Sequence, residues 1–275
     1  MTLSTIRNNP AKQKKVKTKK QKAIAATCAV AFWLLVWHVV SLCVGSELVL
    51  VSPVKVVQTL FMVIFDPNFL KTVWYSAARI LGGFFTALTL GTVLGWVASR
   101  FWVVETLLRP ITAVIKATPV ASFIILVLLW FSGKNLSVII SMLMVFPVIY
   151  MNVLEGIRSA DEKLLEMAQV FRLSVGKKLL YIYLPAVAPF FVSACSVSLG
   201  LCWKSGIAAE VIGTPDGSIG AVFYQAKIFL QTSELLAWTV VVVAVSVAFE
   251  KLFMFLLRLV LKKLKMEDVL NGKRA

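Results

Sequence analysis

The sequence is poor in the side chains on which most enzyme chemistry depends. Its 275 residues include one histidine and four cysteines, and only 15% of the residues are charged. A Ser-His-Asp triad or a multi-histidine metal site would depend on His38 alone, and no partner residue surrounds it at motif spacing. A lone imidazole within an apolar run is more typical of a neutral hydrogen-bonding residue. The cysteines have no C-x-x-C spacing, so they support neither a zinc site nor a disulfide framework: Cys28, Cys43, Cys195 and Cys202.

A phosphate-binding loop is also missing. Gly133-Lys134 and Gly176-Lys177 both lack the glycine that stands five residues before the Gly-Lys pair in such a loop. The chain therefore cannot hydrolyse ATP by that route, and its energy must come from a gradient or from a partner. We expect it to be no enzyme and to bind no cofactor or metal of its own.

Apolar residues are what the sequence has in excess. They make up 59% of the chain, against about 45–50% in soluble proteins, and the mean hydropathy is +0.87. The 29 Lys and Arg residues outnumber the 13 acidic ones, for a net charge of +16, but they gather mainly before the first apolar run and in or after the last. This distribution indicates anionic lipid headgroups and membrane topology rather than nucleic acid as the partner. The chain is predicted to be an integral membrane protein.

Several uncharged stretches approach the roughly 20 residues that a helix needs to cross a bilayer. We expect six transmembrane helices at Ala23–Val44, Thr72–Ala98, Ala117–Gly133, Asn135–Leu154, Leu179–Trp203 and Leu235–Leu257. The third run is short, and we expect it to recruit the amphipathic residues 106–114 as its first turns, with Pro119 as a kink.

The orientation follows from the basic residues between the runs. With both termini inside, the cytoplasmic loops hold most of the Lys and Arg residues, as the positive-inside rule requires. The first run is too long for the core of a signal peptide and lacks a convincing cleavage site, so we interpret it as a retained anchor. The sequence predicts a multi-pass protein of the cell (inner) membrane with both termini in the cytoplasm.

The segment from Arg158 to Pro189 is the most informative cytoplasmic stretch. Ser159 and Glu162 have the spacing of a capping box, and a partly apolar face follows at Leu164, Leu165, Ala168 and Phe171. These features predict an amphipathic helix of about a dozen residues that starts at Ser159. Such a helix can rest on the lipid headgroups or bind a partner protein, and its own pattern leaves both open.

This segment resembles the coupling signature of binding-protein-dependent ABC importer permeases. That pattern reads Glu-Ala-Ala, three residues, Gly, nine residues, Ile, one residue, Leu-Pro. Met167 replaces its first Ala and Arg172 replaces its Gly, so the tight turn is formed either at Arg172 or around Gly176. The resemblance assigns coupling to an ATPase to Glu166, Met167, Ala168, Arg172, Ile182, Leu184 and Pro185.

Further fragments follow in the order and spacing of the nitrate/sulfonate/taurine branch of these permeases. They are Ser52-Pro53, Val57–Leu60, Ser76–Arg79, Gly82–Phe84, Arg109-Pro110, Leu129–Gly133, Phe146-Pro147, Gly156–Arg158, Ala208–Glu210 and Phe229–Thr232. Each fragment is weak, but their succession over most of the chain is specific for the family. It is less specific for the solute, which the resemblance leaves as a sulfonate-, taurine- or nitrate-like anion or a vitamin precursor.

The resemblance implies an all-α type I ABC permease fold, with six transmembrane helices and a cytoplasmic coupling helix between the fourth and fifth. It implies a homodimer, two cytoplasmic ATPase subunits that bind ATP and Mg, and an external solute-binding protein. The expected organisation is a basic tail at 1–22, an anchor at 23–44, the permease core at 72–258 and a second basic tail at 259–275. A gradient-driven carrier or channel and a noncatalytic membrane scaffold are the alternatives, separated by whether an ATPase co-purifies.

Two charged residues near the outer side are candidates for the translocation pathway. Lys204 follows Leu184 by about 30 Å of helix, and Glu210 lies about 240° further around the same helix, so the two share no face unless the helix breaks near Gly206. For Lys204 and for Arg79, snorkelling toward the headgroups is the alternative.

Overall fold

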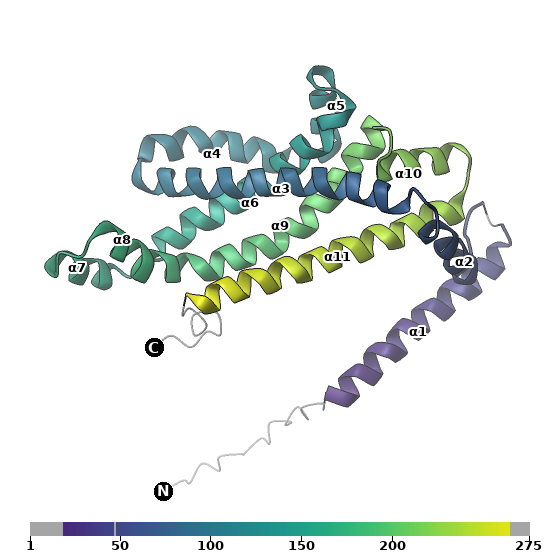
Figure 1. Ribbon diagram of the computed structural model, residues 1–275, viewed down its shortest axis with the longest axis horizontal. Coiled ribbons are helices and arrows are strands. Elements are labelled where there is room, and N and C mark those ends of the chain that lie inside the picture. The colour runs from purple at the N-terminus through teal and green to yellow at the C-terminus, as the bar shows by residue number, and fades with distance from the viewer. Residues whose placement is uncertain (1–18, 47, 265–275) are drawn as a thin grey trace, which may run out of the picture. The chain divides into compact units, whose positions relative to one another are not determined.

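The computed structural model describes residues 19–46 and 48–264, and every regular element within them is helical (Figure 1). The chain divides into two compact units, residues 1–55 and 56–275. The first unit contains α1 and the start of α2. The elements are α1 Lys19–Val44, α2 Pro53–Ile64, α3 Phe69–Arg100, α4 Trp102–Ala117, α5 Val120–Trp130, α6 Gly133–Arg158, α7 Glu162–Val170, α8 Val175–Lys178, the π-helical turn η1 Leu179–Tyr183, α9 Leu184–Gly213, α10 Ile219–Ile228 and α11 Thr232–Lys263. Most of the two tails expected at 1–22 and 259–275 lies outside the described residues.

Among the described residues, five stretches of helix are long and apolar enough to cross a membrane, and a sixth crossing results if α4 and α5 count as one broken span. These two helices meet at an angle of 110°, so the kink expected at Pro119 is a break between two helices. Thr118 is extended, as the residue before a proline tends to be, and Pro119 has no N–H to continue the helix. The sequence therefore located the break correctly.

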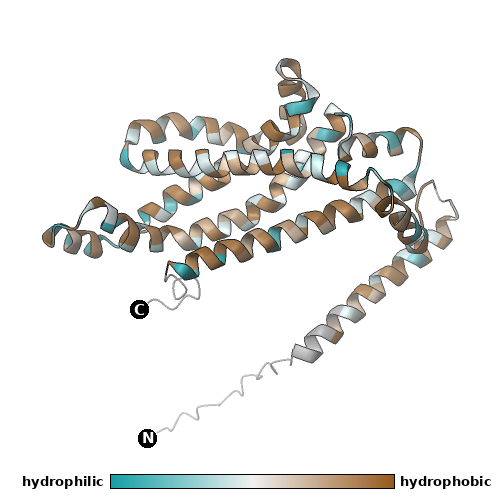
Figure 2. Cartoon of the chain, in the orientation of Figure 1, coloured by the Kyte–Doolittle hydropathy of each residue, from teal (hydrophilic) through white to brown (hydrophobic). Residues whose placement is uncertain are grey.

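The second unit is built on three long helices that pack side by side, α3, α6 and α9. In membrane proteins, helices associate through close packing rather than through the hydrophobic effect, and small residues allow the helices to approach closely. An added Cβ at Gly91 or Gly95 of α3 would lie within 3.1 Å of atoms of α6. Ile80, Phe84 and Val145 are fully buried in the core between these helices. Figure 2 shows that hydrophobic residues cover most of the length of the long helices.

The remaining helices of the second unit are arranged around this core. The apolar side chains of α11 pack on α9 and α3, with Phe84 and Phe253 in edge-to-face contact at 5.3 Å. α10 packs on α11 through a cluster that contains Ile219 and Trp238. α7 and α8 lie at one end of the long helices, whereas α5 and α10 lie toward the other (Figure 1). The segment between α6 and α9 thus lies at the opposite end of the long helices from α5 and α10.

We predict that Gly206→Ala destabilises the protein whereas Gly200→Ala, in the same helix, does not. A Cβ at Gly206 would lie 2.6 Å from Cγ1 of Ile80 and 2.7 Å from Oγ of Ser141, but a Cβ at Gly200 meets nothing within 4 Å. Overpacking of this kind costs about 1–3 kcal/mol. Thermal unfolding of the purified protein in detergent should show a lower midpoint for Gly206→Ala only, and equal midpoints for the two variants would contradict the packing of α3, α6 and α9.

Candidate functional site

The helix expected in the cytoplasmic segment is present, but it begins later than the sequence suggested. α6 continues through Arg158, and Ser159 ends it, with its Oγ donating to the carbonyl of Gly156 at 2.8 Å. The N-cap of α7 is Asp161, whose carboxylate accepts a hydrogen bond from the backbone N–H of Lys163 at 2.9 Å. The capping box predicted from Ser159 and Glu162 is therefore wrong. Asp161 caps the helix in place of Ser159, because its side chain also accepts a hydrogen bond from a backbone N–H that has no partner within the helix.

The apolar residues of α7 divide between an inner and an outer face. Ala168 is fully buried and, with Leu165, packs in a cluster that includes Ile182. Of the apolar face expected at Leu164, Leu165, Ala168 and Phe171, Ala168 therefore packs against the chain itself and Leu165 is half-buried. The outer face, here called the α7 apolar surface, consists of exposed side chains: Leu164 (43%), Met167 (49%), Val170 (79%) and Phe171 (71%).

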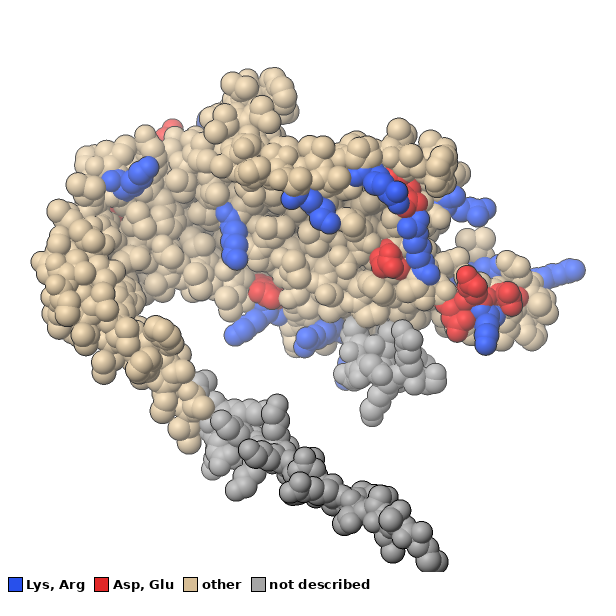
Figure 3. All heavy atoms as spheres, turned by 180° about the vertical axis from the view of Figure 1, so that it is seen from behind, with Lys and Arg blue, Asp and Glu red and all other residues tan. Residues whose placement is uncertain are grey.

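The polar side of α7 carries charge. Glu162 and Glu166 are exposed, and Gln169 extends the same side of the helix. Figure 3 shows acidic side chains next to basic ones at the end of the second unit that carries α7. The helix therefore presents an apolar strip beside a charged one, while its third side packs on the chain itself.

A left-handed turn at Arg172 ends α7. The φ angle of Arg172 is 51°, and the N–H of Leu173 donates to the carbonyl of Ala168 at 2.9 Å while the N–H of Arg172 donates to that of Gln169 at 3.0 Å. These two bonds define a Schellman motif, in which glycine is the usual residue at the left-handed position. The turn is thus made at the position of the family's glycine. The alternative around Gly176 is wrong, because that glycine lies within α8 and has no positive φ.

The second half of the signature leads into α9 through one π-helical turn, η1. The N–H of Leu184 bonds to the carbonyl of Leu179, five residues earlier, and this wider turn precedes Pro185, whose ring would crowd a regular α-helical turn. Ile182 in η1 packs in the cluster of Ala168. The structure thereby brings the two halves of the signature into one contact, from opposite sides of the turn at Arg172.

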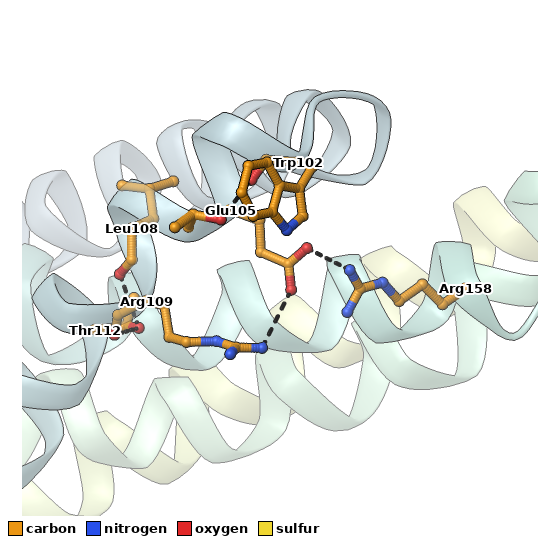
Figure 4. A network of polar contacts seen from close by, with 7 residues as sticks. Trp102, Glu105, Leu108, Arg109, Thr112 and Arg158 are labelled. Carbon is orange, nitrogen blue, oxygen red and sulfur yellow. Dashed lines mark hydrogen bonds and ion pairs between the residues drawn. The ribbon is translucent and has the colours of Figure 1, made fainter.

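A network of charged side chains links α4 to the end of α6, next to α7 (Figure 4). Glu105 is 13% exposed at its side chain and lies 2.5 Å from Nη2 of Arg158, with Nη2 of Arg109 at 3.8 Å. Sequence reasoning missed Glu105. Arg109 and Arg158 each belong to a fragment that resembles the permease family, and this was the only signal in the sequence that the two residues share a site.

Glu210 lies at a buried junction of three helices. Its Oε2 accepts from Oγ of Ser76 in α3 at 2.6 Å and from the N–H of Gly220 in α10 at 3.3 Å, and Ser76 in turn accepts from the N–H of Ile219 at 2.9 Å. The side chain is fully buried, and an added Cβ at Gly220 would collide with it. Its contacts therefore join α9 to α3 and α10 in this structure.

Lys204 occupies a different side of α9, as predicted, because α9 is continuous through Gly206. It is exposed, and Leu201 and Ala208, three residues before and four after it, pack against the cluster formed with α5 and α6. Lys204 therefore lies on the face of α9 that turns toward α5. Arg79 is half-buried; it donates to the backbone carbonyl of Lys134 and lies 4.0 Å from the centre of the Tyr75 ring, so it has partners within the chain.

The polar contacts of Glu105 and Glu210 can hold helices together, and the α7 apolar surface can serve as a docking surface. In the described residues, no group of three or more His, Cys, Asp or Glu side chains could hold a metal ion.

Comparison with known proteins gives consistent results. The putative aliphatic sulfonates transport permease protein SsuC of Bacillus subtilis (strain 168) is 29% identical over 216 residues, 78% of each chain. The taurine transport system permease protein TauC of Escherichia coli (strain K12) is 26% identical over 220 residues, covering 78% of this chain and 80% of that one. A crystal structure of an amino acid ABC transporter shares the fold, with a TM-score of 0.53 and 17% identity over 74% of this chain and 97% of the other.

The family described as "Binding-protein-dependent transport system inner membrane component" matches residues 87–266, which is more than half of the chain. The match includes α7, Arg172, η1 and the whole of α9, that is, all the residues on which the coupling signature was identified. The chain therefore belongs to the family of inner membrane components of binding-protein-dependent transport systems.

Proposed function

We propose that this permease works as a homodimer, moves a small anion across the inner membrane and receives its energy from two ATPase subunits through the α7 apolar surface. The family operates with ATPase and binding-protein partners, and the permease component is not itself catalytic. The observation that carries the proposal is the exposure of Met167, Val170 and Phe171 on a helix whose opposite side is firmly packed.

The proposed orientation places α7 and both termini in the cytoplasm. Basic residues concentrate in the segments that this orientation assigns to the inside, including Lys177 and Lys178 after α7. The permease core is proposed to extend over 72–258, with residues 23–44 as an additional anchor and basic tails at both ends. Asp216, in the loop between α9 and α10, then lies outside.

The way in which α7 is attached supports its proposed coupling role. Its N-terminus follows α6 directly, its C-terminus is fixed by the turn at Arg172, and Ala168 contacts Ile182 at the entrance to α9. A force on the α7 apolar surface would therefore move α6 and α9 together. If α7 only rested on headgroups, its apolar strip would face lipid, and an added charge would have no effect on ATPase binding.

We predict that Met167→Glu abolishes co-purification of the ATPase subunits and solute uptake. Met167 is half exposed within the α7 apolar surface, and an unpaired charge buried at a protein contact costs several kcal/mol. Gln169→Glu is the matched control, because it adds the same charge on the polar side of the same helix. Both variants should reach the membrane in normal amounts, and retention of the ATPase by Met167→Glu at the level of the control would contradict the coupling role.

The solute is proposed to be a small oxyanion. The relatives are named for aliphatic sulfonates, taurine, nitrate and bicarbonate, all of which carry a negatively charged oxygen-rich group. An ammonium on the face of α9 toward α5 would lower the electrostatic barrier for such a solute. We therefore propose that Lys204, rather than Glu210, contacts the pathway. A neutral vitamin precursor would gain nothing from this charge.

Lys204→Met should reduce uptake of an anionic solute, because it keeps the length of the side chain and removes its charge. Lys227→Met is the control, since Lys227 is an exposed lysine in the last turn of α10. Uptake of taurine, an aliphatic sulfonate, nitrate and bicarbonate is measured in cells that also express the partner subunits. We expect a loss of about tenfold for the transported anion, corresponding to about 1.4 kcal/mol. Equal uptake by the two variants, at equal abundance, would assign Lys204 to snorkelling.

A further inference from the structure

Two adjoining cavities lie between the end of α3 and the segment that connects α7 with α9. The larger has a volume of about 710 Å³ and is lined by apolar side chains such as Val93, Val153 and Leu180. The smaller has a volume of about 450 Å³ and shares Trp96, Ile157, Leu179 and Tyr183 with the larger one. The two cavities therefore form one continuous groove, with an apolar part and a second part near the ends of the helices.

The second part of the groove is positively charged. Arg100, in the last turn of α3, and Lys178, at the end of α8, line it together with Ser99. No acidic side chain is among the described residues that line either cavity. Nor does any ion pair of Arg100 or Lys178 occur in the described part of the chain. Lys178 is thus half-buried, and no described residue supplies a countercharge for it.

We propose that this groove binds an anionic phospholipid, with one acyl chain in the apolar cavity and the phosphate between Arg100 and Lys178. The position agrees with the depth of a headgroup, because Arg100 ends a membrane-spanning helix. Trp96 and Tyr183, where the two cavities join, have the amphipathic rings that are enriched at the membrane interface. Basic pockets of this kind between transmembrane helices bind anionic lipid headgroups.

Two other occupants fit the groove less well. A free phosphate would satisfy the two cations but leave the apolar cavity empty. A zwitterionic phospholipid would fill the apolar cavity, but its ammonium group would lie close to Arg100 and Lys178, where no carboxylate is available to it. Only a lipid with a net negative headgroup satisfies both parts of the groove at once.

Three variants of the full-length permease test the site. Arg100→Gln/Lys178→Gln removes the charge that faces the phosphate. Gly176→Leu fills the apolar cavity without changing the charge, since Gly176 lines that cavity and a Cβ there meets nothing within 4 Å. Lys177→Gln is the matched control, because it removes an exposed lysine next in sequence that lines neither cavity.

The measurement is native mass spectrometry of the detergent-purified permease titrated with dioleoylphosphatidylglycerol or dioleoylphosphatidylethanolamine. We expect the phosphatidylglycerol affinity to fall about tenfold or more in the double variant, because each cation near a headgroup contributes to binding. It should also fall in Gly176→Leu, and it should stay within about twofold of the unmodified permease in Lys177→Gln.

Three results would overturn the proposal. The first is an equal phosphatidylglycerol affinity for the double variant and Lys177→Gln. The second is no preference for phosphatidylglycerol over phosphatidylethanolamine in the unmodified permease. The third is displacement of the lipid by millimolar inorganic phosphate, with unchanged phosphate binding in Gly176→Leu, which would identify a free-anion site. Because no ATPase or transport is measured, the result is independent of the coupling role of α7.

Discussion

The antiparallel packing of α6 against α9 is the constraint on which the rest of the structure depends. The two helices are close at both ends, where an added Cβ at Gly133 would collide with Gly213 and one at Gly156 would lie 2.9 Å from Cα of Val187. Between these points, Oγ of Ser141 donates to the carbonyl of Cys202 at 3.1 Å. α7, α8 and η1 form the connection between these same two helices, so the proposed coupling would act on both of them.

Polar contacts extend this pair to its neighbours. At the end near α10, the carboxylate of Glu210 joins α9 to α3 and to α10. At the end near α7, Glu105 joins α4 to α6 through Arg158. Leaving a buried carboxylate without partners is costly, so each junction favours the arrangement of helices that supplies the bonds to Oε2 of Glu210 and the ion pair of Glu105. Two well-defined junctions at opposite ends suit a protein that moves between discrete conformations.

The sequence predicted the long helices well, because uncharged runs of sufficient length leave few alternatives in a membrane. Local details were less predictable. Ser159 and Asp161 are both good N-cap residues, and only the continuation of α6 through Arg158 decides between them. Ala168 is buried because it packs with Ile182, which lies beyond the turn at Arg172. The partners of Glu210 come from α3 and α10, distant in sequence, and no local pattern contains them. The 110° bend at Pro119 likewise exceeds what one proline implies.

Everything proposed for α7 requires that it face the compartment that contains ATP. The direct measurement is labelling of intact cells with a membrane-impermeant maleimide, using Ser174→Cys and Asp216→Cys in a background in which Cys28 and Cys43 are replaced by serine. Both positions are exposed, so accessibility depends on the side of the membrane alone. The account predicts that Asp216→Cys is labelled in intact cells and that Ser174→Cys is labelled only after the membrane is made permeable. Labelling of Ser174→Cys in intact cells, with Asp216→Cys protected, would contradict it.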